Sequence, residues 1–289
     1  MKRKILITGS SGHSGNQIAD LLNGTFDIIG VDLVEGRYTS RFGNLADREF
    51  VLRVTKGIDI IIHSASLHAP HIATHSRKDF IDTNISGTLN LLEASEINGV
   101  KKFIYTSTTS LYGESMHNEN QAAWITEDTQ PLPRDIYDIT KIAAEGLCKD
   151  FFNKESLQTT VLRVSRFWNE PIEKKVFYRM YRGLDVRDVA LAHKLAIGKA
   201  FEKFDIFNIS AQSIFSKDDL YDLKHNTRKL LQKKIPELID LFKTNNWQIP
   251  ESIDRVYVIE KAKKELGYVP RFNIRELLNE ELFGGQPLS

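Results

Sequence analysis

The sequence has little of several features that mark whole classes of protein. It holds a single cysteine, Cys148, so it can form neither an internal disulfide nor a thiolate metal cluster. Its 39 Lys and Arg residues are balanced by 38 Asp and Glu residues, which gives a formal charge of +1. An obligate binder of nucleic acid or another polyanion needs a basic excess, so that class is not expected.

Long apolar runs are also missing. The N-terminus is basic, as in a secretory signal, but the apolar run over residues 5–7 ends at Thr8 and Gly9. No segment approaches the roughly 20 apolar residues of a membrane span. With 41% hydrophobic and 27% charged residues, the composition is that of an ordinary globular protein. We therefore expect a soluble, cytoplasmic protein.

Strand-like and helical segments alternate along the first 165 residues. The longest helical segment, 78–98, has one apolar stripe formed by Ile81, Ile85, Leu89, Leu92 and Ile97. Alternation of this kind, with apolar strands, predicts a parallel sheet with helices on both faces, the doubly wound α/β (Rossmann) class. The expected strands are 4–8, 27–32, 58–63, 102–106 and 159–164, and the expected helices are 14–23, 47–56, 78–98 and 137–152.

After Pro171 the alternation loosens, and neither a low-complexity linker nor an internal repeat occurs. We expect a sheet domain over residues 1–165 and a smaller, mixed α/β lobe over 166–289, with residues near 181–210 able to return to the sheet domain. The expected elements are a helix over 188–200, a strand over 204–209, a long charged helix over 217–242 and a helix over 260–266 that ends at Gly267.

Three glycines with the spacing G-x-x-G-x-x-G follow the first expected strand. Gly9 can make the tight turn, Gly12 lets the backbone approach a pyrophosphate, and Gly15 lets the next helix pack closely. The diphosphate would then lie against the N–H groups at the start of that helix. The same triplet also occurs in plain strand–helix turns, so by itself it is a weak signal.

An acidic residue strengthens the prediction of a dinucleotide site. Asp32 ends the second expected strand, about 20 residues after Gly12, where a carboxylate binds the ribose hydroxyls of adenosine. The same carboxylate would repel a 2′-phosphate, and the glycine loop holds no Arg or Lys. NAD is therefore favoured over NADP, although Arg37 and Arg41 follow closely enough to keep NADP open.

A tyrosine and a lysine suggest acid–base chemistry. Tyr137 and Lys141 are four residues apart in an expected helix, so they face the same way, and an ammonium beside a phenol lowers the pKa of the phenol. The hydroxyls of residues 107–110 follow a strand, at the edge where open parallel sheets hold their sites; alternatively, they form a loop that caps itself. Tyr257 and Lys261 repeat the spacing, but without such hydroxyls we expect them on a surface helix.

Together these residues resemble the extended short-chain dehydrogenase/reductase family, in its NAD-dependent epimerase/dehydratase branch. The similarity runs over nearly the whole chain. The matching segments are the glycine loop at 8–15, His63–Ala65 at the end of the strand expected over 58–63, the helix at 84–93, the serine strand ending in Tyr-Gly at 105–113, and the closing helix at 261–267.

The resemblance implies roles for individual residues. Thr108 falls on the catalytic hydroxyl, Tyr137 on the base, and Lys141 on the lysine that binds the cofactor ribose. It also implies a homodimer whose interface is formed by the helices around 78–98 and 137–152. The cofactor-binding set that it implies is Gly9, Ser11, Gly12, His13, Gly15, Asp32, Asn44, Leu45, Ser64, Ala65, Ser66, Asn84, Thr106, Ser107, Tyr137, Lys141 and Val164.

The chain departs from the nucleotide-sugar members of the family at one segment. Residues 165–171 place Arg166 where those members carry an Asn, and the stretch from Pro171 to residue 188 is short. Both features put a nucleoside diphosphate sugar in doubt and resemble uronate dehydrogenases, which oxidise a free sugar acid. Arg166, Lys174 or Lys175 could pair with a carboxylate or phosphate; alternatively, they are solvated surface charges.

Three histidines follow the strand expected over 58–63, in a loop that borders the substrate cleft in the family. One of them, His68, is a candidate substrate contact. His71 and His75 complete a group of three, but Pro70 interrupts helical spacing and no carboxylate or cysteine joins them, so no metal site is expected. Cys148 lies in an Ala-rich helix and is expected to be a small core residue.

The leading hypothesis is an NAD-dependent enzyme of the epimerase/dehydratase type. It would move a hydride at a secondary hydroxyl of a sugar or sugar derivative, with Thr108, Tyr137 and Lys141 in the chemistry and with His68, Thr108 and Arg166 at the substrate. The alternative is net oxidation of a free sugar acid, as in uronate dehydrogenases. A non-catalytic NAD sensor is disfavoured, because it would have no use for Thr108, Tyr137 and Lys141 together.

Overall fold

The structure is a computed structural model that describes residues 2–155 and 157–283. The chain divides into two compact units, which we call the sheet unit and the second unit. The sheet unit consists of the chain up to Leu111, Pro133–Val164 and Val189–Phe207; the second unit consists of Tyr112–Leu132, Ser165–Asp188 and the chain from Asn208 onward.

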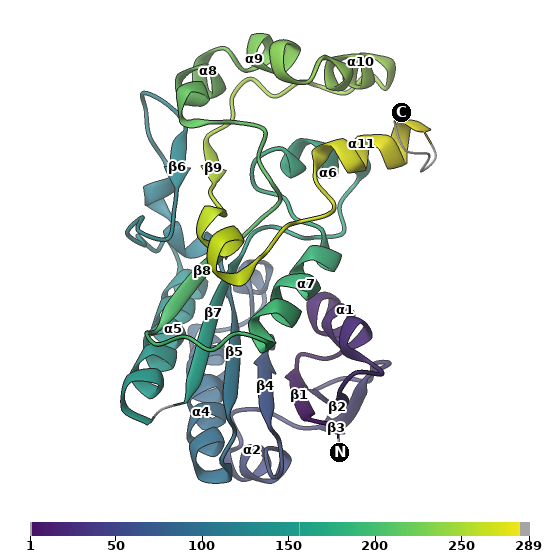
Figure 1. The fold of residues 1–289 in the computed structure, drawn as a ribbon. Helices are drawn as coiled ribbons and strands as arrows, with labels where there is room; N and C mark the ends of the chain where they lie inside the picture. Colours follow the sequence, from purple (N-terminus) through teal and green to yellow (C-terminus); the bar gives the residue numbers. More distant parts are fainter. Residues whose placement is uncertain (1, 156, 284–289) are drawn as a thin grey trace. The chain divides into compact units, whose positions relative to one another are not determined.

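The centre of the fold is a seven-stranded sheet in the order β3-β2-β1-β4-β5-β7-β8 (Figure 1). Neighbouring strands from β3 to β7 run parallel, as the apolar runs predicted. The edge strand β3 was not predicted, because it is short, polar and largely exposed. The strands are β1 (Lys4–Thr8), β2 (Asp27–Asp32), β3 (Thr39–Phe42), β4 (Ile60–His63), β5 (Lys102–Thr108), β7 (Gln158–Val164) and β8 (Asp205–Ile209).

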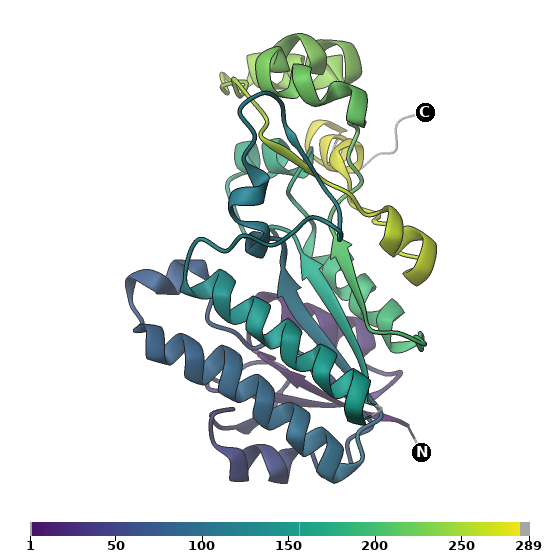
Figure 2. The same ribbon diagram turned by 90° about the vertical axis from the view of Figure 1, so that its left-hand side faces the viewer.

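Helices cover both faces of this sheet (Figures 1 and 2). On one face lie α2 (Arg48–Val54), α4 (Gly87–Asn98) and α5 (Ile136–Glu155), and on the other α1 (His13–Leu22) and α7 (Val186–Ile197). The doubly wound α/β prediction is therefore confirmed. The core under α2, α4 and α5 includes Leu6, Val31, Ile61, Phe103, Val161, Val51, Leu91, Leu92, Ala144 and Cys148, the last as predicted.

The expected helix over 78–98 is continuous but irregular. It starts as α3 (Arg77–Phe80), passes through a π-helical segment, η2 (Ile81–Ser86), and continues as α4. A π turn holds more residues than an α turn, so it shifts which residues face the sheet. Ile81 and Ile97 of the predicted stripe are 42% and 60% exposed, whereas Leu92 of the same stripe is buried.

The second unit has a two-stranded sheet, β6 (Ala123–Ile125) with β9 (Arg255–Tyr257), and several helices. The single helix expected over 217–242 is wrong. Asn226 has non-helical backbone angles, and Pro236 starts a new helix because it has no N–H to donate to a preceding turn. The helices are α6 (Ile172–Arg179), α8 (Leu220–His225), α9 (Thr227–Lys234), α10 (Pro236–Thr244) and α11 (Ile274–Phe283).

Tyr257 does not lie on a surface helix, so that prediction is also wrong. It is a buried residue of β9, and its hydroxyl donates to Met116 Sδ at 3.1 Å. Strand pairing with β6 fixes Tyr257 in extended backbone, so the spacing to Lys261 has no helical meaning. The predicted helix stop is confirmed: the η6 segment (Ala262–Leu266) ends at Gly267, whose φ is +74°.

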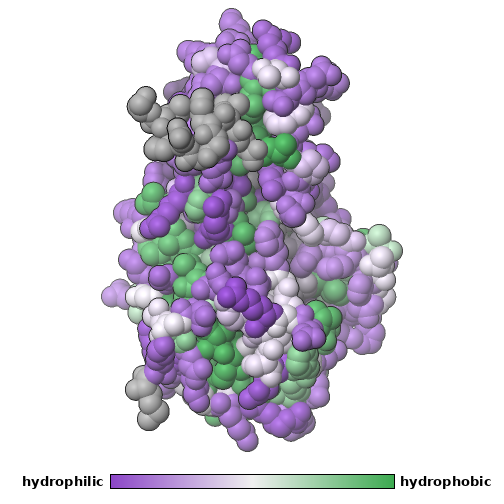
Figure 3. Space-filling view, turned by 90° about the vertical axis from the view of Figure 1, so that its right-hand side faces the viewer, coloured by the Kyte–Doolittle hydropathy of each residue, from purple (hydrophilic) through white to green (hydrophobic). Residues whose placement is uncertain are grey.

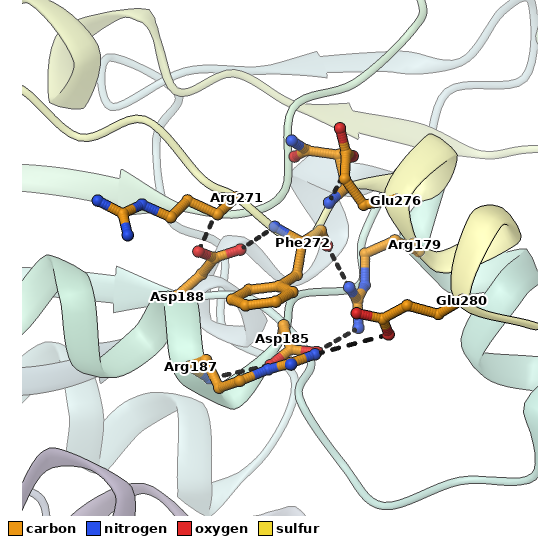
Figure 4. Close-up of polar contacts among 9 residues, drawn as sticks. Arg179, Asp185, Arg187, Asp188, Arg271, Phe272, Glu276 and Glu280 are labelled. Atoms are coloured by element: carbon orange, nitrogen blue, oxygen red, sulfur yellow. Dashed lines mark hydrogen bonds and ion pairs between the residues drawn. The ribbon is translucent and has the colours of Figure 1, made fainter. Parts of the chain in front are cut away.

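Ion pairs anchor the start of α7 within the second unit (Figure 4). The Asp188 carboxylate accepts the N–H groups of Arg271 and Phe272, at 2.8 and 3.0 Å. Arg179 and Arg187 both pair with Asp185 beside it, at 3.4 and 2.8 Å. These contacts hold the segment that precedes α11 against the first turn of α7.

The face drawn in Figure 3 is largely hydrophilic, with hydrophobic side chains in separate groups. Among residues 2–155 and 157–283, no helix is both long and apolar enough to span a bilayer.

Candidate active site

The carboxyl ends of the central strands meet at one edge of the sheet. Thr8 of β1 is paired with His63 of β4, His63 with Tyr105 of β5, and Thr108 of β5 with Val164 of β7. From β1 the chain adds β2 and β3 on one side, and it then returns to add β4, β5, β7 and β8 on the other side. The strand order therefore reverses between β1 and β4. Open α/β sheets bind ligands at such a point.

The glycine loop leaves β1 at this edge, and its backbone needs the glycines. Gly9 has φ +70°, and a Cβ there would lie 2.8 Å from the Ala65 nitrogen. A Cβ at Gly15 would lie 2.0 Å from the Gly9 oxygen. Gly12 precedes α1 without any side-chain cap, and the N-terminus of a helix is where backbone amides can bind a phosphate. These positions fit the diphosphate of a dinucleotide.

Asp32 lies beside this loop, at the end of β2. Its Oδ2 accepts the Ser11 N–H at 2.9 Å, and its Oδ1 accepts the Leu33 N–H at 2.7 Å. The carboxylate is thus held at the position that a ribose diol would approach. Arg37, which kept NADP open in the sequence, pairs with Asp20 at 3.0 Å. The arrangement fits NAD.

Thr108, Tyr137 and Lys141 come together at the same edge; the spacing predicted the common face of Tyr137 and Lys141, and the family resemblance singled out Thr108. Thr108 is the last residue of β5, and its hydroxyl lies close enough to Tyr137, in the first turn of α5, to lower the pKa of the phenol. Lys141 lies one turn later and is 2% exposed. Its Nζ donates to the Thr106 oxygen at 2.7 Å and lies 4.2 Å from the centre of the Tyr105 ring.

The electrostatics differ from the prediction. Burial raises the pKa of Tyr137 to about 12, and the bond from Thr108 opposes this rise only in part. The expected lowering of the phenol pKa by Lys141 is absent, because its ammonium is directed to Thr106 and the Tyr105 ring. Burial also lowers the pKa of Lys141 to about 7, against the opposing charge of Glu145. Lys141 therefore titrates near neutral pH.

A buried ion pair lies behind these residues, and the sequence analysis missed it. Glu145 of α5 accepts from Arg163 of β7 at 2.7 and 3.0 Å, and the two side chains are each 6% exposed. The Ser107 hydroxyl donates to the same carboxylate at 2.6 Å. The available signal was the position of Glu145, one helical turn after Lys141, together with a charge inside an apolar strand.

Asn84 is almost fully buried, at 1% exposure, and links two segments of the site. Its Oδ1 accepts the Leu67 N–H at 2.8 Å, and its Nδ2 donates to the Leu67 oxygen at 2.9 Å and to Thr140 Oγ1 at 3.0 Å. Its side chain therefore ties the loop after β4 to α5.

Other members of the predicted cofactor set point into the protein. The Thr106 hydroxyl bonds His193 Nε2 at 2.8 Å, and Ser64 Oγ donates to the Thr8 oxygen at 2.8 Å. The remaining members lie at the ends of strands or in the turns that follow them: Ser66, Asn44, Leu45 and Val164. Leu45 and Val164 are buried, and the Asn44 side chain accepts the Ala46 N–H. His13 is exposed at the first residue of α1.

His68 lies in the loop after β4, close enough to Lys141 to be affected by its charge. Burial, the charge of His71 and that of Lys141 lower the pKa of His68 to about 4. The His68 N–H donates to His71 Nδ1 at 3.0 Å, and the His71 N–H donates to the His68 carbonyl oxygen at 2.8 Å. The described residues contain no group of three or more side chains that could hold a metal ion.

Arg166 belongs to the second unit, where the structure gives it a partner. Its Nε lies 3.1 Å from both carboxylate oxygens of Glu170, so its charge is already neutralised. The guanidinium of Arg182 lies over the ring of Tyr178, 4.0 Å from its centre, and its buried Nε has no hydrogen-bond partner among the described contacts. The sequence analysis missed Arg182, whose Nε, unlike that of Arg166, has no carboxylate partner among the described residues.

Known proteins resemble this chain over most of its length. It is 24% identical over 260 residues, 82% of the chain and 75% of the relative, to N-acetyl-alpha-D-glucosaminyl-diphospho-ditrans,octacis-undecaprenol 4-epimerase from Escherichia coli O157:H7. The fold matches UDP-glucose 4-epimerase from Thermotoga maritima with a TM-score of 0.70 at 24% identity, over 95% and 96% of the two chains. A mutated uronate dehydrogenase matches with a TM-score of 0.69 at 18% identity, over 100% and 88%.

The sequence model of one family matches the chain from β1 through β7 and the short segment that follows β7. The match covers residues 5–171, more than half of the chain, and includes the glycine loop, Asp32, Thr108, Tyr137 and Lys141. The chain therefore belongs to the NAD-dependent epimerase/dehydratase family, and it is an NAD-dependent enzyme of the extended short-chain dehydrogenase/reductase type.

Proposed function

We propose that this enzyme moves a hydride at a secondary hydroxyl of a sugar or sugar derivative, with Tyr137 as the acid–base group. The observation that carries the proposal is the proximity of the Tyr137 and Thr108 hydroxyls, with Lys141 one helical turn away, at the edge where the glycine loop begins. When bound, NAD supplies the hydride acceptor. Gly9, Gly12, Gly15 and Asp32 would hold it.

The proton steps follow from the three side chains. Thr108 holds the substrate oxygen beside Tyr137, which takes the hydroxyl proton and can return it. Burial opposes the phenolate, so the cost of deprotonating Tyr137 must be offset locally. The Thr108 hydroxyl already opposes the rise. The ammonium of Lys141, one helical turn away, would have to turn from the Thr106 oxygen to assist, and it can do so only while it is protonated.

Removal of one hydroxyl tests this proposal. Tyr137→Phe should lower kcat by at least about 100-fold, since proton transfer of this kind contributes 10²–10⁴-fold, while NAD binding is kept. Turnover of candidate sugars and calorimetric NAD binding are the two measurements. Tyr221→Phe, at an exposed tyrosine, is the matched control. Full turnover in Tyr137→Phe would exclude the mechanism, and tight NAD binding with no turnover of any sugar by the wild type would favour a sensor.

The alternative reaction is net oxidation of a free sugar acid. It is supported by the fold match to uronate dehydrogenase over the whole chain, and by the cations Arg166 and Arg182 in the second unit. A carboxylate or phosphate would have to displace Glu170 to reach Arg166. Stoichiometric NADH formed from a uronate would establish oxidation. Interconversion of a sugar or sugar nucleotide without net NADH would establish epimerisation.

We also propose that the enzyme is a homodimer that associates through α4 and α5. The two helices pack side by side on one face of the sheet (Figure 2). Ile81, Ile97 and Ile139 are large apolar side chains that remain exposed there. A second copy of the same face would cover them and exclude water from them.

A further inference from the structure

His63 is a buried titratable residue that the proposed chemistry does not use. It is the last residue of β4, is 1% exposed, and is enclosed by the rings of Phe103 and Tyr105. Its Nδ1 lies 2.7 Å from Thr8 Oγ1, and its Nε2 lies 2.9 Å from Thr88 Oγ1. One side chain thus links β1, β4 and α4.

The neighbouring groups determine which way these bonds run. Thr88 Oγ1 donates its hydrogen to the Asn84 carbonyl oxygen at 2.7 Å, because a carbonyl can only accept. The Thr88 oxygen therefore accepts from Nε2–H of His63, which leaves Nδ1 as an acceptor. Thr8 donates its hydroxyl hydrogen to that nitrogen, and its oxygen accepts the Ala65 N–H at 3.2 Å. One neutral tautomer satisfies every group in the chain.

This chain of bonds is fixed at the beginning of the glycine loop. Thr8 directly precedes Gly9, whose tight turn packs on Ala65 so closely that no Cβ would fit. The Gly9 N–H donates to the Val31 oxygen of β2 at 2.9 Å, which sets the start of the loop on its other side. The Thr8–His63 bond therefore controls where the loop leaves the sheet.

We propose that His63 is a positioning residue for NAD, which fixes the start of the glycine loop through its hydrogen bond to Thr8. The bond to Thr88 then has the separate task of orienting the imidazole. The inference depends on the binding of NAD, which the family match establishes, and not on the choice of sugar or on Tyr137. An ordinary core histidine would instead support the fold equally through both bonds.

Two substitutions at His63 separate these roles, because Asn reaches about as far as Nδ1 and Gln about as far as Nε2. His63→Asn can keep the bond to Thr8 and should bind NAD within about threefold of wild type. His63→Gln can keep only the bond to Thr88 and should bind NAD about tenfold more weakly, the loss expected for one buried hydrogen bond. Calorimetric binding of NAD and thermal unfolding of the free protein are measured for both.

A second pair of variants keeps the test decisive if the His63 variants fail to fold. Thr8→Val and Thr88→Val have nearly the shape of threonine, and each removes one of the two hydroxyls. Thr8→Val should weaken NAD binding about tenfold, whereas Thr88→Val should lower the unfolding temperature and leave NAD binding within about threefold. Equal losses of NAD affinity in both members of a pair would overturn the proposal. Because binding is read without turnover, that result would leave the proposed reaction untouched.

Discussion

The charge on Lys141 depends on one buried carboxylate. Burial alone lowers the pKa of Lys141 and favours the neutral amine. The negative charge of Glu145, one turn along α5, raises that pKa and opposes the effect of burial. Glu145 is in turn neutralised by Arg163 and accepts from Ser107. The ion pair therefore serves both the packing of α5 on β7 and the protonation of the lysine.

Glu145→Gln should damage both functions. Arg163 would keep a buried charge without its partner, so the free energy of unfolding should fall by about 3–5 kcal/mol. With the nearby negative charge removed, the pKa of Lys141 falls further, so the alkaline limb of the pH–rate profile should move to lower pH. Urea unfolding and pH–rate profiles measure the two effects.

Asp150→Asn is the control for that experiment. Asp150 lies on the same helix but is half exposed, and its pair with Lys154, at 2.7 Å, is a surface ion pair worth at most about 1 kcal/mol. It should change neither measurement by much. A Glu145→Gln protein as stable as Asp150→Asn, with an unshifted profile, would contradict the assigned role.

At the scale of elements, helical phase decides which side chains are left for a partner. The predicted stripe over 78–98 assumed one uninterrupted α-helix, but the π turn at η2 changes the phase before α4 begins. Leu91 and Leu92 then face the sheet, while Ile81 and Ile97 do not. Ile81 and Ile97 are therefore two large apolar side chains that the fold leaves available to a partner.

Ile139→Glu tests the proposed dimer. Ile139 is 50% exposed on α5, so a carboxylate there costs the folded monomer little but would be desolvated in an interface. We expect the variant to be monomeric by analytical ultracentrifugation at concentrations where the wild type is dimeric. Val269→Glu, at an exposed apolar residue of the second unit, should leave the dimer intact. An unchanged dimer in Ile139→Glu would exclude this interface.

At the scale of the whole molecule, folding keeps several histidines neutral. Burial lowers the pKa of His63 to about 3 and those of His68 and His193 to about 4. In the unfolded chain each returns to about 6.5. Between about pH 4 and 6.5 the unfolded state therefore binds more protons, so the free energy of unfolding must fall as the pH drops through this window.

The expected slope is as much as about 1.4 kcal/mol per pH unit for each histidine. Urea unfolding at a series of pH values from 7 down to 4.5 measures it. His193→Gln should reduce the slope, because it removes one of the contributing groups, whereas His117→Gln, at an exposed histidine, should not. A stability that stays constant from pH 7 to 4.5 would contradict the neutral assignment.

Local patterns were sufficient for the features that depend on neighbouring residues alone. The alternation of apolar strands and helices, the glycine loop with Asp32, the helix stop at Gly267 and the common face of Tyr137 and Lys141 all follow from short-range spacing, because backbone geometry fixes those relations within a few residues. The same reasoning misplaced Tyr257, because pairing between β6 and β9 overrides a helical spacing.

Contacts between distant segments decided the rest. The register of β5 against β7 and the packing of α5 select Thr108, among neighbouring hydroxyls, as the partner of Tyr137, and they bring Arg163 to Glu145. The bonds of His63 to Thr8 and Thr88 join residues from three elements. Desolvation and hydrogen-bond partners exist only once those elements have packed, so the sequence determined which groups the site contains, and the tertiary structure decided their charges and their partners.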